Sequence, residues 1–190
     1  MRLEKNYQPF HELVPLKGKI LDAGCGYGFM SYMLYFSSTQ REITGIDYDE
    51  DKIITANHCF SKTDKINFIH SDVLSFAFEN YDAIILSDML HYLQPADQKT
   101  VIEKSIHQLN PGGIVIIREG DKDSMEKHKR TELTEFFSTK LFSFNKTAAK
   151  GLSFLSGKTI GEMAVTNDME CKEIKNSKYT SNTIFLKKRS

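Results

Sequence analysis

Tryptophan is absent from this 190-residue sequence, and proline and cysteine are scarce, with four and three copies. The cysteines, Cys25, Cys59 and Cys171, lie far apart and show no zinc-site spacing. Free thiols in a reducing compartment are the simplest interpretation. We therefore expect neither a disulfide framework nor a metal site.

Excess charge of either sign is also absent, because 25 Lys and Arg residues balance 25 Asp and Glu residues. A dedicated nucleic-acid binder would show a basic excess, so we expect no nucleic-acid partner. No apolar run approaches the roughly 18 residues of a membrane span. The first 13 residues also lack the apolar stretch of a signal peptide. We expect a cytoplasmic protein, and the length predicts one domain over residues 1–190.

An alternation of strand-like and helix-like segments dominates what is present. Four β-rich runs occupy residues 19–23, 42–47, 65–70 and 81–87. Helical patterns alternate with them at residues 27–37, 49–60 and 95–109. Asn110-Pro-Gly-Gly113 predicts a strong turn, and residues 114–117 form the most strand-like run of the chain. Alternating strands and helices predict an α/β fold with a doubly wound, mostly parallel sheet.

The last part of the chain follows a different pattern. A helix that opens at Ser156 or Thr159 precedes two strand-like runs, 170–176 and 183–187, which predict an antiparallel hairpin at the sheet edge. Residues 121–155, charged at first and rich in phenylalanine later, are interpreted as a substrate-side insertion. With Tyr7 and Phe10, these phenylalanines would form an apolar acceptor pocket, unless they pack only against the sheet.

The loop after the first strand is the most informative motif. It reads Ile20-Leu-Asp-Ala-Gly24-Cys-Gly26-Tyr-Gly28, and it opens a predicted helix. Glycines here allow a tight turn and a close approach of the backbone to a ligand. A dinucleotide fingerprint requires a third glycine at position 29, which is Phe29. The alternative interpretation is a plain strand-to-helix turn.

Acidic residues follow the second and third strands. Asp47, at the tip of the second strand, is placed to accept hydrogen bonds from both hydroxyls of a ribose. Asp72, followed by Val73, is placed to bind an adenine through its exocyclic amine and its ring face. The alternative for Asp47 is that it only caps a turn, and Asp72 alone is a weak signal because Asp is common at strand ends. Their occurrence together with the glycine loop favours a nucleoside ligand.

In this order, the motifs resemble the class I S-adenosylmethionine-dependent methyltransferases over about residues 15–120. The resemblance implies a seven-stranded, Rossmann-like sheet with a C-terminal antiparallel hairpin. The implied cofactor is S-adenosylmethionine, with S-adenosylhomocysteine as product. The implied cofactor-binding residues are Asp22, Gly24, Cys25, Gly26 and Gly28 for the methionine part, Asp47 for the ribose, Asp72 and Val73 for the adenine, with Tyr48 and Ser87 beside them.

A narrower resemblance concerns Asn6–Leu13, Gly45–Glu50, Glu135–Ser138 and Phe144–Thr147. These segments resemble the methyltransferase part of bacterial fusion proteins in which an exporter and an acyltransferase come first. This resemblance implies a phenolic, aromatic or lipid-like small-molecule acceptor. It also implies action beside membrane-associated partner domains.

Candidate bases for deprotonating an acceptor lie at the tip of the fourth strand, because ligands of such sheets bind at the carboxyl ends of the strands. His91 is the first candidate, since its ordinary pKa suits proton transfer at neutral pH. Asp88, Tyr92 and Glu119, the last of these at the tip of the fifth strand, follow in that order. The alternative is that His91 only packs beside the cofactor.

Two functions from other classes compete with methyl transfer. An NAD-dependent oxidoreductase uses a similar sheet, but Phe29, Asp72 and the closing hairpin weigh against it. A non-catalytic scaffold that binds S-adenosylmethionine is the second alternative, and the intact cofactor motifs weaken it without removing it.

Overall fold

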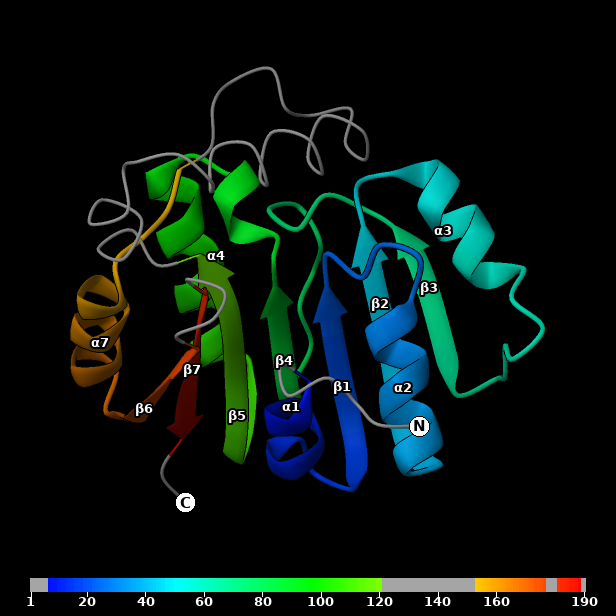
Figure 1. Ribbon diagram of the computed structural model, residues 1–190, viewed down its shortest axis with the longest axis horizontal. Coiled ribbons are helices and arrows are strands. Elements are labelled where there is room, and N and C mark those ends of the chain that lie inside the picture. Colours follow the sequence, from blue (N-terminus) through cyan, green and yellow to red (C-terminus); the bar gives the residue numbers. More distant parts are fainter. Residues whose placement is uncertain (1–6, 121–152, 177–180, 189–190) are drawn as a thin grey trace.

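A seven-stranded sheet organises the computed structural model, which describes residues 7–120, 153–176 and 181–188 (Figure 1). The sheet order is β3-β2-β1-β4-β5-β7-β6. The strands are β1 (Lys17–Ala23), β2 (Gln40–Asp47), β3 (Ile66–His70), β4 (Tyr81–Ser87), β5 (Leu109–Gly120), β6 (Met169–Asn176) and β7 (Ser181–Lys188). The first five strands pair in parallel, and β7 pairs antiparallel with both β5 and β6. The predicted doubly wound sheet with its closing hairpin is confirmed.

Helices cover both faces of this sheet, as expected for parallel strands with continuous apolar centres. The helices are α1 (Gln8–Leu13), α2 (Phe29–Ser37), α3 (Glu50–Asn57), the 3-10 turn η1 (Leu90–Tyr92), α4 (Pro95–His107) and α7 (Gly157–Thr166). One core cluster lies between the sheet and α1, α2 and α3, and the other lies between the sheet and η1, α4 and α7. The two layers leave the carboxyl ends of β1, β2, β4 and β5 at one edge (Figure 1).

Helix starts follow the expected chemistry. Asp49 caps α3 by accepting a hydrogen bond from Asp51 N at 3.1 Å, and Ser156 caps α7 by accepting one from Thr159 N at 3.2 Å. Pro95 opens α4, where its missing N–H costs nothing. These helices therefore begin within one residue of the predicted positions.

The predicted turn at Asn110–Gly113 is wrong, because these residues lie inside β5. The pairing register between β4 and β5 shifts between Tyr81 and Ala83, and Gly112 adopts a φ of 73° there. The glycines and proline thus make an irregularity in a continuing strand. Residues 121–152, which contain most of the predicted insertion, lie outside the described residues.

Arg41 on β2 is completely buried and ties together three parts of the fold. Its Nε donates to Pro15 O at 2.7 Å, and Nη2 donates to Val14 O at 2.8 Å. Its Nη1 donates to Leu34 O at 2.6 Å and to Ser37 Oγ at 2.5 Å, at the C-terminal end of α2. One side chain therefore fastens the segment between α1 and β1 to both α2 and the sheet.

Candidate functional site

The loop between β1 and α2 needs its glycines because its backbone adopts positive φ angles. Gly24, Gly26 and Gly28 have φ values of 75°, 55° and 79°, in the left-handed region where side chains are strained. A Cβ on Gly28 would lie 2.4 Å from Phe68 Cζ, and one on Gly24 would lie 2.6 Å from Met89 Cβ. A Cβ on Gly26 would meet no atom within 4 Å. Space for a ligand is therefore open above Gly26.

Backbone hydrogen bonds fix this loop on the end of β2. Gly24 N and Cys25 N both donate to Ile46 O, at 2.8 and 2.9 Å. Asp47 accepts from Gly26 N at 2.8 Å through Oδ2 and from Asp49 N at 2.9 Å through Oδ1. A carboxylate has about four acceptor positions, so both oxygens retain capacity for hydroxyl donors. The structure thus brings Asp47 and the glycine loop together, and a ribose diol matches the remaining acceptors.

Asp22 differs from Asp47 because it is buried, with a relative exposure of 2%. Ser31 Oγ on α2 donates to Asp22 Oδ2 at 2.7 Å. Burial raises the pKa of Asp22 to about 6, while the Ser31 hydrogen bond opposes that rise. Because Asp22 is buried, its carboxylate has little exposed surface for hydrogen bonds with a ligand. It can act on a cationic ligand mainly through its negative charge.

Asp72 and Val73 follow β3 at the same edge. Asp72 Oδ1 accepts from Leu74 N at 2.8 Å, and Val73 is buried in the core cluster on the α4 side. Lys104 on α4, which the sequence reasoning missed, donates from Nζ to Leu74 O at 3.1 Å and to Phe76 O at 2.5 Å. Lys104 therefore holds the loop that follows Asp72 against α4.

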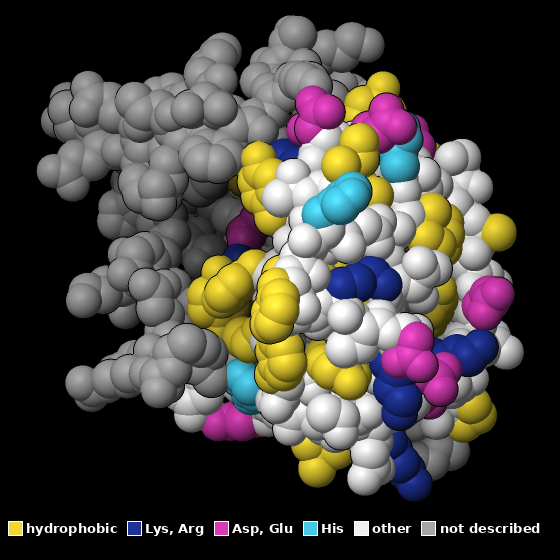
Figure 2. Space-filling model, turned by 90° about the vertical axis from the view of Figure 1, so that its right-hand side faces the viewer, with side chains coloured by type: hydrophobic (Ala, Val, Ile, Leu, Met, Phe, Trp, Pro, Cys, Tyr) yellow, Lys and Arg dark blue, Asp and Glu magenta, His cyan; other side chains and the backbone are white. Residues whose placement is uncertain are grey.

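The remaining predicted cofactor residues have different degrees of exposure. Cys25 is buried, and burial raises the pKa of its thiol, which keeps it protonated and unreactive. Tyr48 is 65% exposed, and Ser87 Oγ donates to Asp88 Oδ2 at 3.3 Å. Exposed hydrophobic side chains appear on the α2 and α3 side of the molecule in Figure 2, and Tyr48, Phe29 and Phe36 are among the most exposed.

Two of the candidate bases, His91 and Asp88, each lie beside a charged residue of β5. His91 is buried, with a relative exposure of 4%, and its Nδ1 lies 2.7 Å from Glu119 Oε2. Glu119 Oε1 accepts from Leu90 N at 2.7 Å, so the carboxylate is fixed on both oxygens. His91 Nε2 has no hydrogen-bond partner among the described residues. Glu119, the lowest-ranked candidate base from the sequence, thus orients His91, the highest-ranked one.

Aromatic rings surround this histidine. The His91 ring stacks on Phe154 with centroids 5.4 Å apart and lies 4.2 Å from the Tyr92 ring. A cavity of about 10 Å³, room for about one water molecule, is lined by His91, Glu119 and Phe154 among others. Of the predicted pocket phenylalanines, Phe154 is described and lies against His91, whereas those in 121–152 lie outside the described residues.

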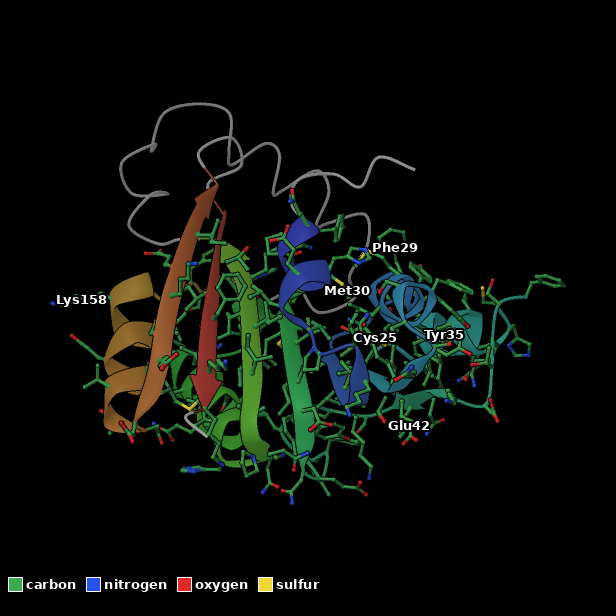
Figure 3. All side chains as sticks on the ribbon, turned by 90° about the horizontal axis from the view of Figure 1, so that it is seen from below. Cys25, Phe29, Met30, Tyr35, Glu42 and Lys158 are labelled. Atoms are coloured by element: carbon green, nitrogen blue, oxygen red, sulfur yellow. The ribbon has the colours of Figure 1, made fainter. Side chains whose placement is uncertain are left out.

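Asp88 forms the second pair, with Arg118 on β5. Asp88 has a φ of 53°, an unusual value outside glycine that Asp tolerates better than most residues. Arg118 lies with its guanidinium carbon 4.9 Å from the Tyr7 ring centroid and 5.6 Å from that of Phe10. Tyr7 in turn contacts Phe29 of α2, on the side of that helix next to α1 (Figure 3). The sequence offered one signal for Arg118: a charged residue directly after the apolar run Ile114–Ile117.

The described residues show neither a metal site nor a membrane-spanning helix. No group of three His, Cys, Asp or Glu side chains in residues 7–120, 153–176 and 181–188 has the arrangement of a metal site. Within the same residues, no helix is long and apolar enough to cross a membrane.

Comparisons with known proteins agree with this geometry. Residues 20–113 match a family model described as "Methyltransferase domain". The carboxy-S-adenosyl-L-methionine synthase of Campylobacter fetus is 30% identical over 118 residues, which cover 62% of this chain and 47% of that protein. The chain therefore spans about half the length of the curated relatives it matches.

Solved structures share the fold at low identity. An O-methyltransferase family protein from Burkholderia thailandensis superposes with a TM-score of 0.74 and 16% identity, covering 98% of this chain and 57% of that one. Human N-acetylserotonin methyltransferase, solved in complex with SAM, gives a TM-score of 0.71 and 19% identity, covering 98% of this chain and 52% of that one.

Proposed function

Since the chain belongs to the class I S-adenosylmethionine-dependent methyltransferases, we propose that it transfers the methyl group of S-adenosylmethionine to a small-molecule acceptor. The observation that carries the proposal is the Gly26–Asp47 cradle, where a carboxylate with spare acceptors borders open space above a left-handed glycine. S-adenosylmethionine, when bound, supplies a methyl group activated on a sulfonium, and S-adenosylhomocysteine remains as product.

The residues proposed to hold the cofactor follow from their contacts. Asp47 accepts the ribose hydroxyls, and the loop Gly24–Gly28 approaches the methionine part through its backbone. Asp22 supplies negative charge to the cationic end from beneath the loop. Asp72 and Val73 meet the adenine, and Tyr48 and Ser87 flank the site.

His91 is the proposed base, with Glu119 as its positioning residue. The Glu119 carboxylate fixes Nδ1 at 2.7 Å, which directs the other nitrogen, Nε2, to take a proton. Asp88 is the weaker candidate, because its carboxylate is already engaged in an ion pair with Arg118. Tyr92 packs on the His91 ring and supports its orientation.

His91→Asn is expected to lower kcat by roughly 10²–10⁴-fold, the usual contribution of a general base. The dissociation constant for S-adenosylhomocysteine should stay within about threefold, because His91 lies on the Glu119 side of the site. Steady-state kinetics and calorimetry measure the two quantities. His107→Asn, on the exposed face of α4, is the matched control. A His91→Asn enzyme with unchanged turnover would assign His91 a packing role.

Gly26→Ala and Gly28→Ala are expected to separate binding from stability. Both positions have positive φ, so each alanine costs about 1–2 kcal/mol of backbone strain. Gly26→Ala adds a Cβ only to the open space, so the affinity for S-adenosylhomocysteine should fall at least roughly tenfold, or by about 1.4 kcal/mol. Gly28→Ala must also displace Phe68 and should lose more thermal stability. Equal affinities in wild type and Gly26→Ala would contradict the cradle.

The proposed acceptor is aromatic, phenolic or lipid-like. Tyr7 and Phe29 supply aromatic surface beside Arg118, and Phe154 supplies more beside His91. Action beside membrane-associated partner domains is proposed from the sequence resemblance, and a cytoplasmic location is proposed from the unpaired cysteines. Incubation with labelled cofactor and a panel of phenols and lysophospholipids tests the acceptor class, and methylation of unrelated compounds alone would overturn it.

Thermal unfolding with S-adenosylhomocysteine and with NAD tests the cofactor site directly. A ligand at 100 times its dissociation constant adds about 2.7 kcal/mol to stability. For a chain of this size the melting temperature should rise by roughly 5–10 °C with S-adenosylhomocysteine and stay constant with NAD. Binding without turnover of any acceptor would favour the scaffold function, and no shift with either ligand would overturn the proposed function.

A second candidate is the synthesis of carboxy-S-adenosyl-L-methionine, which the similarity to carboxy-S-adenosyl-L-methionine synthases supports. Mass spectrometry of the cofactor after incubation separates the two. Methyl transfer converts it to S-adenosylhomocysteine, whereas the synthesis of carboxy-S-adenosyl-L-methionine, given a carboxyl donor, leaves a heavier carboxylated compound.

A further inference from the structure

Two arginines, Arg41 and Arg118, are largely buried, and the hydrogen-bond donors of their guanidinium groups have very different partners. Arg41 uses Nε, Nη1 and Nη2, all of which donate to carbonyl or hydroxyl oxygens. Arg118 has a side-chain exposure of 14%; the carboxylate of Asp88 pairs with its Nη2, and the Tyr7 side chain also hydrogen-bonds to it. A guanidinium has five N–H donors in a planar fork. Arg118 therefore retains donors for a further oxygen ligand.

Arg118 lies at the edge of the sheet where the ligand is proposed to bind. Arg118 pairs in register with Ser87, the last residue of β4, at the carboxyl end of the sheet. Its positive charge acts on Asp22, the buried carboxyl of β1. Burial by itself would lower the pKa of Arg118, but Asp88 and then Tyr7 reverse this and the net direction is upward, so the cation is permanent.

The neighbours of Arg118 hold its guanidinium in place without covering all of it. Tyr7 and Phe10 lie at cation–π distance, 4.9 and 5.6 Å. The Asp88 carboxylate pairs with the Nη2 atom of Arg118, and the backbone of Asp88 is in the left-handed region. The Asp88 side chain is 49% exposed. A fixed guanidinium beside a half-exposed carboxylate is suited to bind a second carboxylate in bidentate geometry.

We propose that Arg118 is the carboxylate receptor of this site, binding a ligand carboxylate beside that of Asp88. The inference rests on the proposed function and names a binding residue for it. Asp22, Asp47, Asp72 and Asp88 make the edge acidic, which suits a sulfonium and an ammonium but repels a carboxylate. Arg118 offsets that repulsion locally. The carboxylate comes either from the amino-acid end of the cofactor or from the acceptor.

Paired ligands distinguish these two sources. 5′-Methylthioadenosine keeps the adenine, ribose and thioether of S-adenosylhomocysteine but lacks its amino-acid end. Calorimetry of both compounds is compared in wild type, Arg118→Met and Arg118→Lys. Methionine keeps the apolar stem against Tyr7 and Phe10, and lysine keeps the charge without the fork.

If the cofactor supplies the carboxylate, Arg118→Met weakens S-adenosylhomocysteine binding roughly tenfold to a hundredfold. Binding of 5′-methylthioadenosine then stays within about twofold, which also proves that the variant is folded. Arg118→Lys recovers part of the loss. If the acceptor supplies the carboxylate, both cofactor analogues bind normally. Wild type saturated with S-adenosylhomocysteine then prefers 4-hydroxybenzoate to 4-hydroxybenzamide, and Arg118→Met removes that preference.

The proposal is overturned if Arg118→Met weakens the binding of both cofactor analogues equally. It is also overturned if the variant binds both analogues as wild type does and wild type shows no preference for 4-hydroxybenzoate over 4-hydroxybenzamide. Failure of the proposed function has a separate signature. In that case wild type itself binds neither S-adenosylhomocysteine nor 5′-methylthioadenosine.

Discussion

Replacement of Asp22 by asparagine is expected to raise the melting temperature of the ligand-free protein and to remove most of its affinity for S-adenosylhomocysteine. The stability gain follows from the buried carboxyl, whose pKa burial raises from 3.8 to about 6. The folded protein therefore holds a proton between about pH 4 and pH 6 that the unfolded chain has released. This contribution to stability is present at low pH and is lost as the pH rises through about 6.

At pH 7.5 the wild type carries this burial penalty in full, and Asp22→Asn does not. A shift of about two pKa units corresponds to an upper limit of about 3 kcal/mol. The new amide N–H groups need partners, so the gain will be smaller than this limit. A rise in melting temperature of roughly 3–10 °C is expected. Below about pH 4 the two proteins should unfold at similar temperatures.

The loss of affinity has an electrostatic cause. Asp22 supplies a negative charge in a place withdrawn from water, and removing such a charged partner costs roughly tenfold to a hundredfold in affinity. Wild-type affinity should also fall as the pH drops below about 6, by up to about tenfold per unit, while that of Asp22→Asn stays flat. Calorimetry from pH 5 to pH 8 measures both curves.

Asp82→Asn provides the matched control, because Asp82 lies near the opposite end of the sheet on β4. Asp82 accepts from Lys19 N at 2.8 Å and from Asn110 Nδ2 at 2.9 Å, so its loss should lower stability without changing the pH dependence of binding. An Asp22→Asn variant that binds S-adenosylhomocysteine as tightly as wild type at pH 7.5 would remove Asp22 from the binding site.

Replacement of Arg41 by methionine is expected to cause the largest loss of stability. The change leaves Val14 O and Pro15 O without their guanidinium donors and weakens the end of α2 at Leu34 O. Each buried carbonyl left without a partner costs about 1–3 kcal/mol, so a total of about 3–5 kcal/mol is expected. The melting temperature should fall by roughly 6–20 °C. Arg41→Lys should lose part of this, because one ammonium cannot reach all the oxygens.

The loss at Arg41 should be felt first in the N-terminal segment, because Val14 and Pro15 connect α1 to β1. Limited proteolysis should therefore cut Arg41→Met near residues 13–17 before the rest of the chain unfolds. Lys65→Met is the control: Lys65 Nζ donates to Thr39 O at 3.1 Å on an exposed surface, and its loss should cost less than about 0.5 kcal/mol. Equal losses in both variants would show that Arg41 contributes no more than a surface contact.

The sequence by itself determined the features that depend on local chemistry and periodicity. Apolar runs near 20, 43, 84 and 115 predicted buried strands, and the structure places them in one sheet. The glycines at 24, 26 and 28 predicted a tight loop because left-handed backbone excludes other side chains, and all three have positive φ. The hairpin at 169–188 also followed from its local pattern.

Only the tertiary structure decided which polar groups meet. Asn110–Gly113 carries turn residues, yet it lies within β5, as an irregularity between two paired positions: Leu109 pairs with Tyr81, and Ile114 pairs with Ala83. Asp22 and Asp47 look alike in sequence, but one faces Ser31 in the core and the other faces a loop. The partnership of Asp88 with Arg118 joins residues 30 positions apart. Such pairs depend on strand order and register, which no local pattern encodes, and they set the charge and proton affinity on which a site's chemistry depends.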